Sequence, residues 1–233
     1  MSGRGRADLH MHTTASDGWP TPAALVDHVS RRTDLNVIAI TDHDTIEGAL
    51  RAADRAAGRP RLEVVIGEEV SSRDGHIVGL FLERTIPPGM SAAATVHAIH
   101  DQGGLAFAAH PFWRTRRQVR SGPVHGLGWL AAEFDFDAIE IENATPGFYV
   151  FNQLARRLND GLGSAELGCS DAHIVDAVGR AYTAFPGSTA TDLRSAIESA
   201  KTRACRRRYK AVGLMRYAAW GINHQRYAVA IPS

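Results

Sequence analysis

Two observations predict an α/β fold, a βα barrel that is closed or slightly irregular. Short, nearly continuous apolar runs alternate with helical patterns as far as about residue 200, which is typical of buried parallel strands covered by helices. The chain has 233 residues, 44% of them hydrophobic, and a barrel of this length commonly buries one core. We therefore expect residues 1–233 to form a single barrel domain, with 203–233 as a basic C-terminal extension.

The predicted strands are short runs of Val, Ile, Leu, Phe and Ala. They comprise 37–40, 64–66, 77–80, 105–108, 138–141 and 167–169. A further strand is expected just before His10. Alternation of such runs with helices favours a parallel sheet whose outer face is covered.

Cap residues and helix breakers mark the predicted helices. Thr21 followed by Pro22 places an N-cap before a proline at the first helical position. Asp44 with Glu47 resembles a capping box that opens a second helix. Gly58 and Pro60 end this second helix. A third helix is expected from the cap residue Ser91 to Gly103-Gly104, a fourth over 149–159, and a fifth over 191–202 with Thr191 as its cap.

The last thirty residues differ from the preceding chain. From Lys201 to Arg216, seven positions are Lys or Arg, and the apolar periodicity is weaker. We expect a solvated tail or a final helix that packs on the barrel. The alternative is a contact with another subunit or with a polyanion.

Composition excludes several classes of function. Lys and Arg number 26 against 25 Asp and Glu, which argues against bulk binding of nucleic acid or of an acidic membrane. The two cysteines, Cys169 and Cys205, cannot form a disulfide framework, so a reducing compartment fits best. No apolar run follows the N-terminal arginines, and none approaches the ~18–20 residues of a membrane span. These features predict a cytoplasmic protein without a membrane partner.

Histidines and acids gather in short clusters, most of them at the ends of predicted strands. The candidate ligands are His10, His12, Asp17, His43, Glu69, His76, His110, Asp171 and His173. Residues i and i+2 of a strand face the same side, so His10 and His12 can hold one ion. Carboxyl ends of barrel strands meet on one rim, and mixed imidazole and carboxylate ligands suit Mn, Zn or Fe. The pattern predicts a hydrolytic site that binds more than one divalent metal ion.

A single histidine at a strand end is more often a hydrogen-bonded core or surface residue than a ligand. Several such motifs in one chain make coincidence a poor explanation. The other five histidines do not occupy strand ends; they are His28, His97, His100, His125 and His224.

The series DLHMHT, SDG, AITDHDT, GEEVS, GHIVGL, GGLAFAAHP and CSDAH resembles the PHP (polymerase and histidinol phosphatase) domain. The resemblance runs from about residue 7 to about residue 202 and implies a distorted (β/α)7 barrel with a centre of two or three divalent metal ions on its rim. It implies a first metal bound by His10, His12, Glu69 and Asp171, a second bound by Glu69, His76 and His110, and a third bound by Asp17, His43 and His173. The Gly-x-Glu spacing of the family selects Glu69 rather than Glu68.

Such a centre is expected to hydrolyse phosphate esters with a metal-bridging hydroxide as nucleophile. The favoured activity is a phosphomonoesterase on a small phosphorylated metabolite or nucleotide, with Asp171 and His110 as catalytic candidates. The candidate substrate contacts are Arg114, Arg116, Arg117, Asn143 and Arg180. The alternatives are hydrolysis of a phosphodiester, a cyclic phosphate or an amide or carbamate, and a non-catalytic metal-binding module.

Nucleic acid is expected only as a nucleotide or short oligonucleotide substrate, and the sequence does not determine the oligomeric state. Phosphatases of the resembled family that act on nucleotide 3′,5′-bisphosphates usually carry a helical insertion after the position of His76. Here the stretch from His76 to His110 holds one predicted helix and its turns, which is too short for such a lid. The pocket is expected to be open, or capped by residues 111–135 or by a partner chain.

Overall fold

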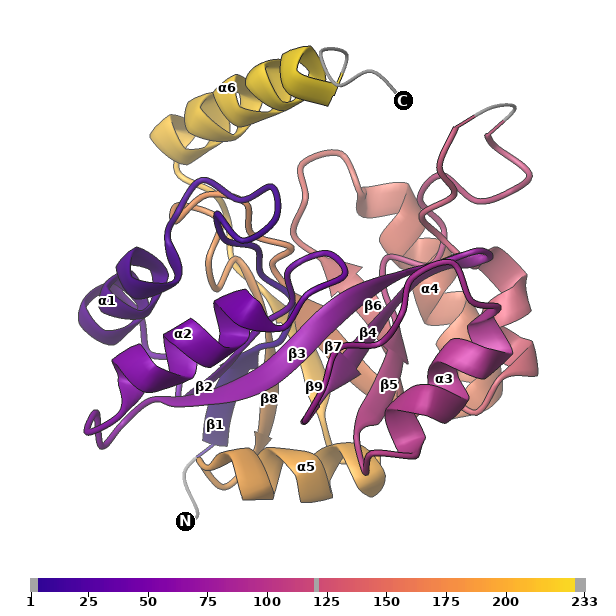
Figure 1. The fold of residues 1–233 in the computed structure, drawn as a ribbon, viewed down its shortest axis with the longest axis horizontal. Helices are drawn as coiled ribbons and strands as arrows, with labels where there is room; N and C mark the ends of the chain where they lie inside the picture. Colours follow the sequence, from indigo (N-terminus) through magenta and orange to yellow (C-terminus); the bar gives the residue numbers. More distant parts are fainter. Residues whose placement is uncertain (1–3, 120–121, 229–233) are drawn as a thin grey trace.

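The computed structural model describes residues 4–119 and 122–228. Within these ranges one mixed sheet of nine strands curls into a distorted, nearly closed barrel (Figure 1). The strands are β1 (Arg4–Asp8), β2 (Val37–Ile40), β3 (Glu63–Ser72), β4 (Gly75–Leu80), β5 (Leu105–Ala108), β6 (Ala138–Asn143), β7 (Ala165–Cys169), β8 (Ala181–Pro186) and β9 (Arg203–Arg206). Their order is β7-β6-β5-β4-β3-β2-β1-β8-β9. The predicted distorted α/β barrel is confirmed.

The sheet is parallel only in part. Strands β1, β2 and β3 run parallel, as do β5, β6 and β7. Strands β3 and β4 instead form an antiparallel hairpin, because the chain turns back within Ser72–Gly75 and Gly75 adopts a φ of +150°. Strand β4 is also antiparallel to β5, and β8 is antiparallel to β1 and β9. The prediction of a parallel sheet is wrong for these pairs. No helix separates β3 from β4, whereas β4 and β5 are antiparallel although the helix at Ala92–His100 lies between them in the chain.

Two close approaches bring β7 against β8 and β9. The Thr183 hydroxyl of β8 accepts a hydrogen bond from the Gly168 N–H of β7 at 3.1 Å and donates one to the Gly168 carbonyl at 3.0 Å. A Cβ at Gly168 would lie 2.7 Å from the Tyr182 carbonyl oxygen and 3.0 Å from the Cys205 nitrogen. Glycine is therefore needed where the barrel closes.

The helices are α1 (Pro22–Arg32), α2 (Glu47–Ala56), α3 (Ala92–His100), α4 (Tyr149–Leu162), α5 (Ala190–Glu198) and α6 (Ala211–Ala228), with a short 3₁₀ helix at Gly128–Glu133. Two predicted caps are confirmed: the Thr21 hydroxyl accepts a hydrogen bond from the Ala24 N–H, and the Ser91 hydroxyl accepts one from the Ala94 N–H.

Two predicted caps are wrong. Helix α2 begins at Glu47 without a side-chain cap, because the Asp44 carboxylate accepts a hydrogen bond from the Ser71 N–H instead, at 2.7 Å. Helix α5 is capped by Thr189 in a capping box with Asp192, two residues before the predicted cap. Thr191, the predicted cap, lies inside this helix.

The barrel interior is apolar and is closed at one end by α5. Leu193, Ala196 and Ile197 of α5 pack with Ala7, Val37, Val65, Leu105 and Phe107 from the strands. Helices α1 and α2 cover one side of the barrel, and α3 and α4 cover another (Figure 1). Burial at the α5 end leaves the opposite end available for a site.

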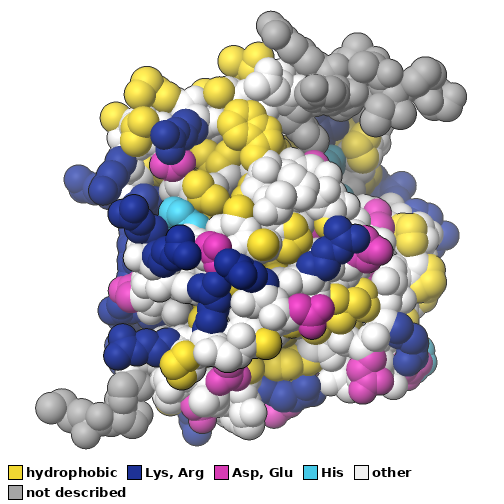
Figure 2. Space-filling model, turned by 60° about the vertical axis from the view of Figure 1, so that its left-hand side comes forward, with side chains coloured by type: hydrophobic (Ala, Val, Ile, Leu, Met, Phe, Trp, Pro, Cys, Tyr) yellow, Lys and Arg dark blue, Asp and Glu magenta, His cyan; other side chains and the backbone are white. Residues whose placement is uncertain are grey.

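The C-terminal extension is built into the fold as β9 and α6. Strand β9 pairs with β8, and α6 lies over the end of the barrel opposite α5 (Figure 1). Apolar side chains gather on the surface at this end (Figure 2), and the exposed ones on α6 are Val212, Leu214, Met215 and Ile222. No helix within the described ranges is both long and apolar enough to cross a bilayer.

Candidate metal centre

Most candidate ligands lie just beyond the carboxyl ends of β1, β2, β5 and β7, at the end of the barrel opposite α5. Glu69 instead lies within β3, and His76 lies at the start of the antiparallel strand β4. The backbone after β1 stays extended and pairs with the backbone after β7 through a bridge between Met11 and Ala172. Side chains alternate along an extended backbone, so His10 and His12 face the same side. The bridge places Asp171 and His173, the two neighbours of Ala172, beside this segment, so the four ligand candidates lie on one edge.

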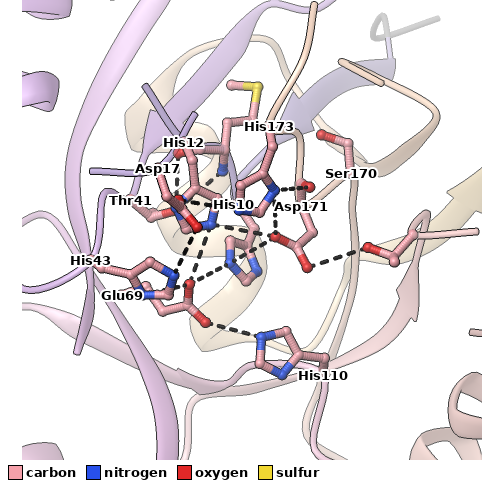
Figure 3. A network of polar contacts seen from close by, with 12 residues as sticks. His10, His12, Asp17, Thr41, His43, Glu69, His110, Ser170, Asp171 and His173 are labelled. Atoms are coloured by element: carbon pink, nitrogen blue, oxygen red, sulfur yellow. Dashed lines mark hydrogen bonds and ion pairs between the residues drawn. The ribbon is translucent and has the colours of Figure 1, made fainter. Parts of the chain in front are cut away.

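Glu69 occupies the middle of the cluster (Figure 3). One carboxylate oxygen, Oε2, lies 3.2 Å from His10 Nε2, 3.3 Å from His12 Nε2 and 3.3 Å from His43 Nδ1. The other oxygen, Oε1, lies 2.8 Å from His76 Nδ1 and 3.0 Å from His110 Nε2. The two oxygens thus face different sets of imidazoles, which is the arrangement expected of a bridging carboxylate.

Asp171 lies beside the same imidazoles and is held from outside the cluster. Its Oδ1 is 3.3 Å from His12 Nε2 and 3.6 Å from His10 Nε2. Its Oδ2 accepts hydrogen bonds from Asn143 Nδ2 at 3.2 Å and from the Thr145 hydroxyl at 3.4 Å. Asp171 also has a φ of +51°, a left-handed conformation that costs about 1–3 kcal/mol and is common at functional sites.

A second group surrounds Asp17. Its Oδ1 lies 3.3 Å from His173 Nε2 and 3.5 Å from His12 Nδ1, and its Oδ2 lies 3.9 Å from His43 Nε2. One ligand atom from each of these four residues lies within 4.8 Å of the others. The His12 ring thus lies between the Glu69 group and the Asp17 group.

The donor atoms fit divalent metal ions. Two ligands that are each about 2.1 Å from one ion lie about 3–3.5 Å apart, close to the spacings around Glu69. Buried imidazole nitrogens without a hydrogen-bond partner in the described structure include His10 Nε2, both ring nitrogens of His12, and His43 Nδ1. Unpartnered buried nitrogens are costly, and a bound ion would satisfy them.

The charges of the metal-free cluster are shared between carboxylates and imidazoles. Burial alone would raise the pKa of Glu69, but His43 and His10 hold that pKa well below its usual range. Burial would lower the pKa of His12, yet its contacts with Asp171 and Glu69 raise it to about 10. Burial lowers the pKa of His43 to about 4. The ionised carboxylates therefore require cations, which are protons when no metal is bound.

Further side chains fix the orientation of the ligands. Glu140 Oε1 lies 3.2 Å from His10 Nδ1, so the Nε2 atom of that ring faces Glu69. Glu140 Oε2 accepts a hydrogen bond from the His110 N–H at 2.5 Å. Asp42 accepts hydrogen bonds from the Thr13 N–H and hydroxyl, both at 2.7 Å. Carboxylates that hold ligand histidines in this way commonly tune metal affinity.

Comparisons with known proteins agree with this arrangement. A family model described as "PHP-associated" matches residues 150–202. The uncharacterized protein MJ1587 of Methanocaldococcus jannaschii is 34% identical over 163 residues, which cover 64% of this chain and 88% of that protein. A two-domain protein from Bacteroides vulgatus, described as containing a predicted PHP-like metal-dependent phosphoesterase, has a TM-score of 0.70 and 20% identity over 88% of this chain and 65% of its own.

This chain belongs to the PHP family of metal-dependent phosphoesterases. Two other relatives match over a shorter stretch. A 5′-3′ exoribonuclease of Haemophilus influenzae is 44% identical over 84 residues, and a 3′,5′-nucleoside bisphosphate phosphatase of Chromobacterium violaceum is 39% identical over 84 residues. Each match covers 34% of this chain but only 30% and 29% of the relative.

Aromatic side chains form the wall of the pocket above this PHP site. The cavity measures about 160 Å³, and its lining combines the candidate ligands with Trp113, His125, Thr145, Phe148, Tyr217 and Trp220. Trp113 contacts His125 and Phe148, with ring centroids 4.7 and 5.3 Å apart. Part of the 111–135 segment covers the site, as one of the sequence alternatives anticipates, but α6 supplies two further residues.

The five predicted substrate contacts lie in different places, and none of them is among the described residues that line this pocket. Arg180 lines a separate basic hollow and donates hydrogen bonds to the carbonyls of Asp176 and Arg208. Arg116 is exposed and donates to the Arg73 carbonyl. The other three are Arg117, which is exposed, Asn143, which bonds to Asp171, and Arg114, whose buried Nε has no hydrogen-bond partner in the described structure.

Sequence reasoning missed several residues of the site. Glu140 has one signal, an acidic residue within the buried run of β6. His125 was set aside because it does not follow a strand, yet its ring lies 4.5 Å from that of His76. Tyr217 and Trp220 carry no signal, because each lies more than forty residues after His173, the last residue of the nearest metal-binding motif.

Proposed function

We propose that this PHP protein is a metal-dependent phosphomonoesterase that acts on a small phosphorylated metabolite or nucleotide. One observation carries the proposal. Three buried imidazole nitrogens that lack hydrogen-bond partners in the described structure surround Oε2 of Glu69, and ring nitrogens of His76 and His110 contact its Oε1. Such a donor set suits two neighbouring divalent ions, with Mn, Zn and Fe as the candidates.

The proposed ligands are the nine residues of the predicted set. Glu69 would bridge two ions, with His10, His12 and Asp171 on one side and His76 and His110 on the other. The group of Asp17, His43 and His173 would hold a third ion, which His12 also approaches. When bound, such ions supply Lewis-acid chemistry and lower the pKa of water.

The chain itself would position the ester and manage its proton. Asp171 and His110 are the proposed catalytic residues, since both line the pocket and both have positive φ values. Arg114 is the best placed of the predicted arginines, because its carbonyl accepts a hydrogen bond from the N–H of the pocket residue His125 at 3.1 Å and its buried Nε has no hydrogen-bond partner in the described structure. We propose it as a phosphate contact.

The pocket wall supports a small substrate with an aromatic group. Trp113, Phe148 and Trp220 border a confined cavity of about 160 Å³, and aromatic rings of this kind stack on nucleobases at about 1–3 kcal/mol per base. The names of the exoribonuclease and bisphosphate phosphatase relatives are consistent with a nucleotide-like substrate. Because an exoribonuclease cleaves phosphodiester bonds, its similarity to this chain favours phosphodiester hydrolysis as a second candidate function.

The test is a metal-resolved substrate screen. Protein purified without chelator is analysed for bound metal and then assayed with Mn, Zn or Fe on phosphomonoesters, phosphodiesters and cyclic phosphates. We expect turnover of a mononucleotide or another small monoester that is lost in excess chelator. Preferential turnover of diesters would select the second candidate. Hydrolysis of no phosphate ester by the metal-loaded protein would contradict the proposal.

Two ligand variants and one matched histidine control sharpen this test. His12→Ala and Asp171→Asn are expected to abolish turnover while leaving the far-UV spectrum unchanged, because neither side chain belongs to the apolar barrel interior. His97→Ala serves as control, since this side chain is 78% exposed on α3 and forms only a surface pair with Asp101. Near-native activity in either ligand variant would refute the assigned ligand set.

A further inference from the structure

Helix α6 lies directly against the Asp17 group of candidate ligands. Trp220 is partly buried at the pocket, and its ring lies 4.2 Å from the His173 ring, centroid to centroid, with an angle of 39° between the planes. The His173 ring also stacks on His12 at 4.2 Å and 16°. The His173 imidazole is therefore restricted by two ring contacts, one with His12 near the N-terminus and one with Trp220 near the C-terminus.

The same tryptophan also contacts the loop that carries Asp17. Its indole Nε1–H donates a hydrogen bond to the Asp17 carbonyl oxygen at 3.1 Å. One side chain of α6 thus touches two members of the group formed by His12, Asp17, His43 and His173. These two residues come from opposite ends of the barrel sequence, and Trp220 joins them.

Neighbouring residues hold α6 in this position. Tyr217 is buried, and its hydroxyl lies 3.2 Å from the Thr145 hydroxyl, which in turn donates to Asp171. The Tyr217 and Trp220 rings are 5.5 Å apart. Arg216 donates a hydrogen bond to Asp176 at 2.9 Å. The helix is therefore fixed over the cluster by specific polar and aromatic contacts.

We propose that Trp220 is a positioning residue for the metal subsite of Asp17, His43 and His173, so that α6 completes the centre. Side chains that orient metal ligands without binding the ion typically affect affinity about 10- to 100-fold. The indole restricts both the His173 ring and the backbone of the Asp17 loop. Its loss should weaken this subsite and spare the ions held by Glu69.

The inference rests on the proposed metal centre, and its test measures bound metal rather than turnover. Trp220→Ala removes both contacts, and Trp220→Phe keeps a ring but removes the hydrogen bond to Asp17. Met215→Ala is the matched control, because Met215 is 65% exposed on the same helix. Metal per chain is measured at limiting free metal, and anomalous diffraction from Mn-loaded crystals locates each ion.

We expect wild type and Met215→Ala to bind an ion between Asp17, His43 and His173. Trp220→Ala should bind this ion about 10- to 100-fold more weakly, with Trp220→Phe between the two and with ions at Glu69 unchanged. Unchanged affinity at the Asp17 subsite in Trp220→Ala would overturn the inference while leaving the proposed function intact. A wild-type protein that binds no ion at Glu69 and hydrolyses no ester would instead refute the proposed function.

Discussion

At the scale of single residues, Glu69 and the carboxylates around it determine what the cluster can bind. The Glu69 carboxylate faces imidazoles on both sides, and Asp171 and Asp17 extend the same negative charge. These acids are buried or partly buried, so cations must accompany them. Protons and divalent metals compete for the same histidine nitrogens.

This competition predicts a pH dependence for metal affinity. His12 must lose its proton to bind an ion, and its contacts with Asp171 and Glu69 raise its pKa to about 10 in the metal-free protein. Affinity should therefore keep rising as the pH increases from 6 to 9, with proton release on binding. Calorimetric titration of the metal-free protein with Mn or Zn, in buffers of different ionisation enthalpy, measures the affinity and the number of protons released. Affinity that is constant over this range would contradict the prediction.

The same groups predict how the stability of the metal-free protein changes with pH. Because the pKa of His12 is raised above its ordinary 6.5, its contribution is fully present below that value and is lost as the pH rises toward 10. The pKa values of Glu69 and Asp171 are lowered, so their contributions disappear in acid. Thermal unfolding of chelated protein should show highest stability between about pH 5 and 7. A maximum near pH 9 would be inconsistent with these shifts.

Glu140 provides a residue-scale test of ligand orientation. Glu140→Gln keeps the size of the side chain but replaces an oxygen that faces His10 Nδ1 or the His110 N–H. Metal affinity should fall about 10- to 100-fold, with little change in the far-UV spectrum. Competition with a fluorescent chelator measures the affinity. Glu166→Gln, on the outer part of β7 near Arg156 and Arg157, is the control and should bind metal like the wild type.

At the scale of elements, the sequence predicts strands and ligands better than it predicts connections. Most ligand motifs are visible because they follow an apolar run that ends at the same rim, as for Leu105–Ala108 before His110. His76 instead precedes the apolar run of β4. The hairpin from β3 to β4 could not be anticipated from apolar runs alone, because such a run has the same composition whether its strand is parallel or antiparallel to its neighbour. Asp44 and Thr191 mislead because residues with cap chemistry also serve loops and helix interiors.

At Gly48 in helix α2, we expect alanine to destabilise the protein although alanine favours helices more than glycine does. A Cβ at Gly48 would fall well inside van der Waals contact of the Asp42 carboxylate, which holds Thr13 and Ser16. Gly48→Ala should therefore destabilise the protein by about 1–3 kcal/mol and weaken metal binding at Asp17. In α4, where nothing surrounds Gly161, Gly161→Ala should instead stabilise by about 0.5–1 kcal/mol. Urea unfolding compares the two, and equal effects would rule out the crowding at Asp42.

At the scale of the whole molecule, the two ends of the barrel differ in structure and in proposed role. The α5 end closes an apolar interior, as Phe107 and Leu193 show, and the opposite end carries the candidate metal ligands. The function of α6 could not be read from its sequence, because a basic, weakly periodic segment resembles a solvated tail. Its docking depends on Tyr217 and Trp220, whose partners are distant in the chain.

Metal binding should stabilise the folded chain as a whole. Ligands that bind only the native state add about 2.7 kcal/mol at a concentration 100 times the Kd, so chelation should lower the Tm by several degrees. Differential scanning calorimetry with and without chelator measures this shift. Asp171→Asn is expected to show a smaller shift than wild type. An unchanged Tm on chelation would mean that the cluster binds no ion in the native state.

The most direct measurement is anomalous diffraction from crystals of protein purified without chelator, with data collected at the Mn, Fe and Zn absorption edges. Our account predicts an anomalous peak on each side of the Glu69 carboxylate, within about 2.0–2.2 Å of its oxygens and of the surrounding imidazole nitrogens. A well-ordered cluster without such peaks, in protein that still hydrolyses phosphate esters in excess chelator, would contradict it.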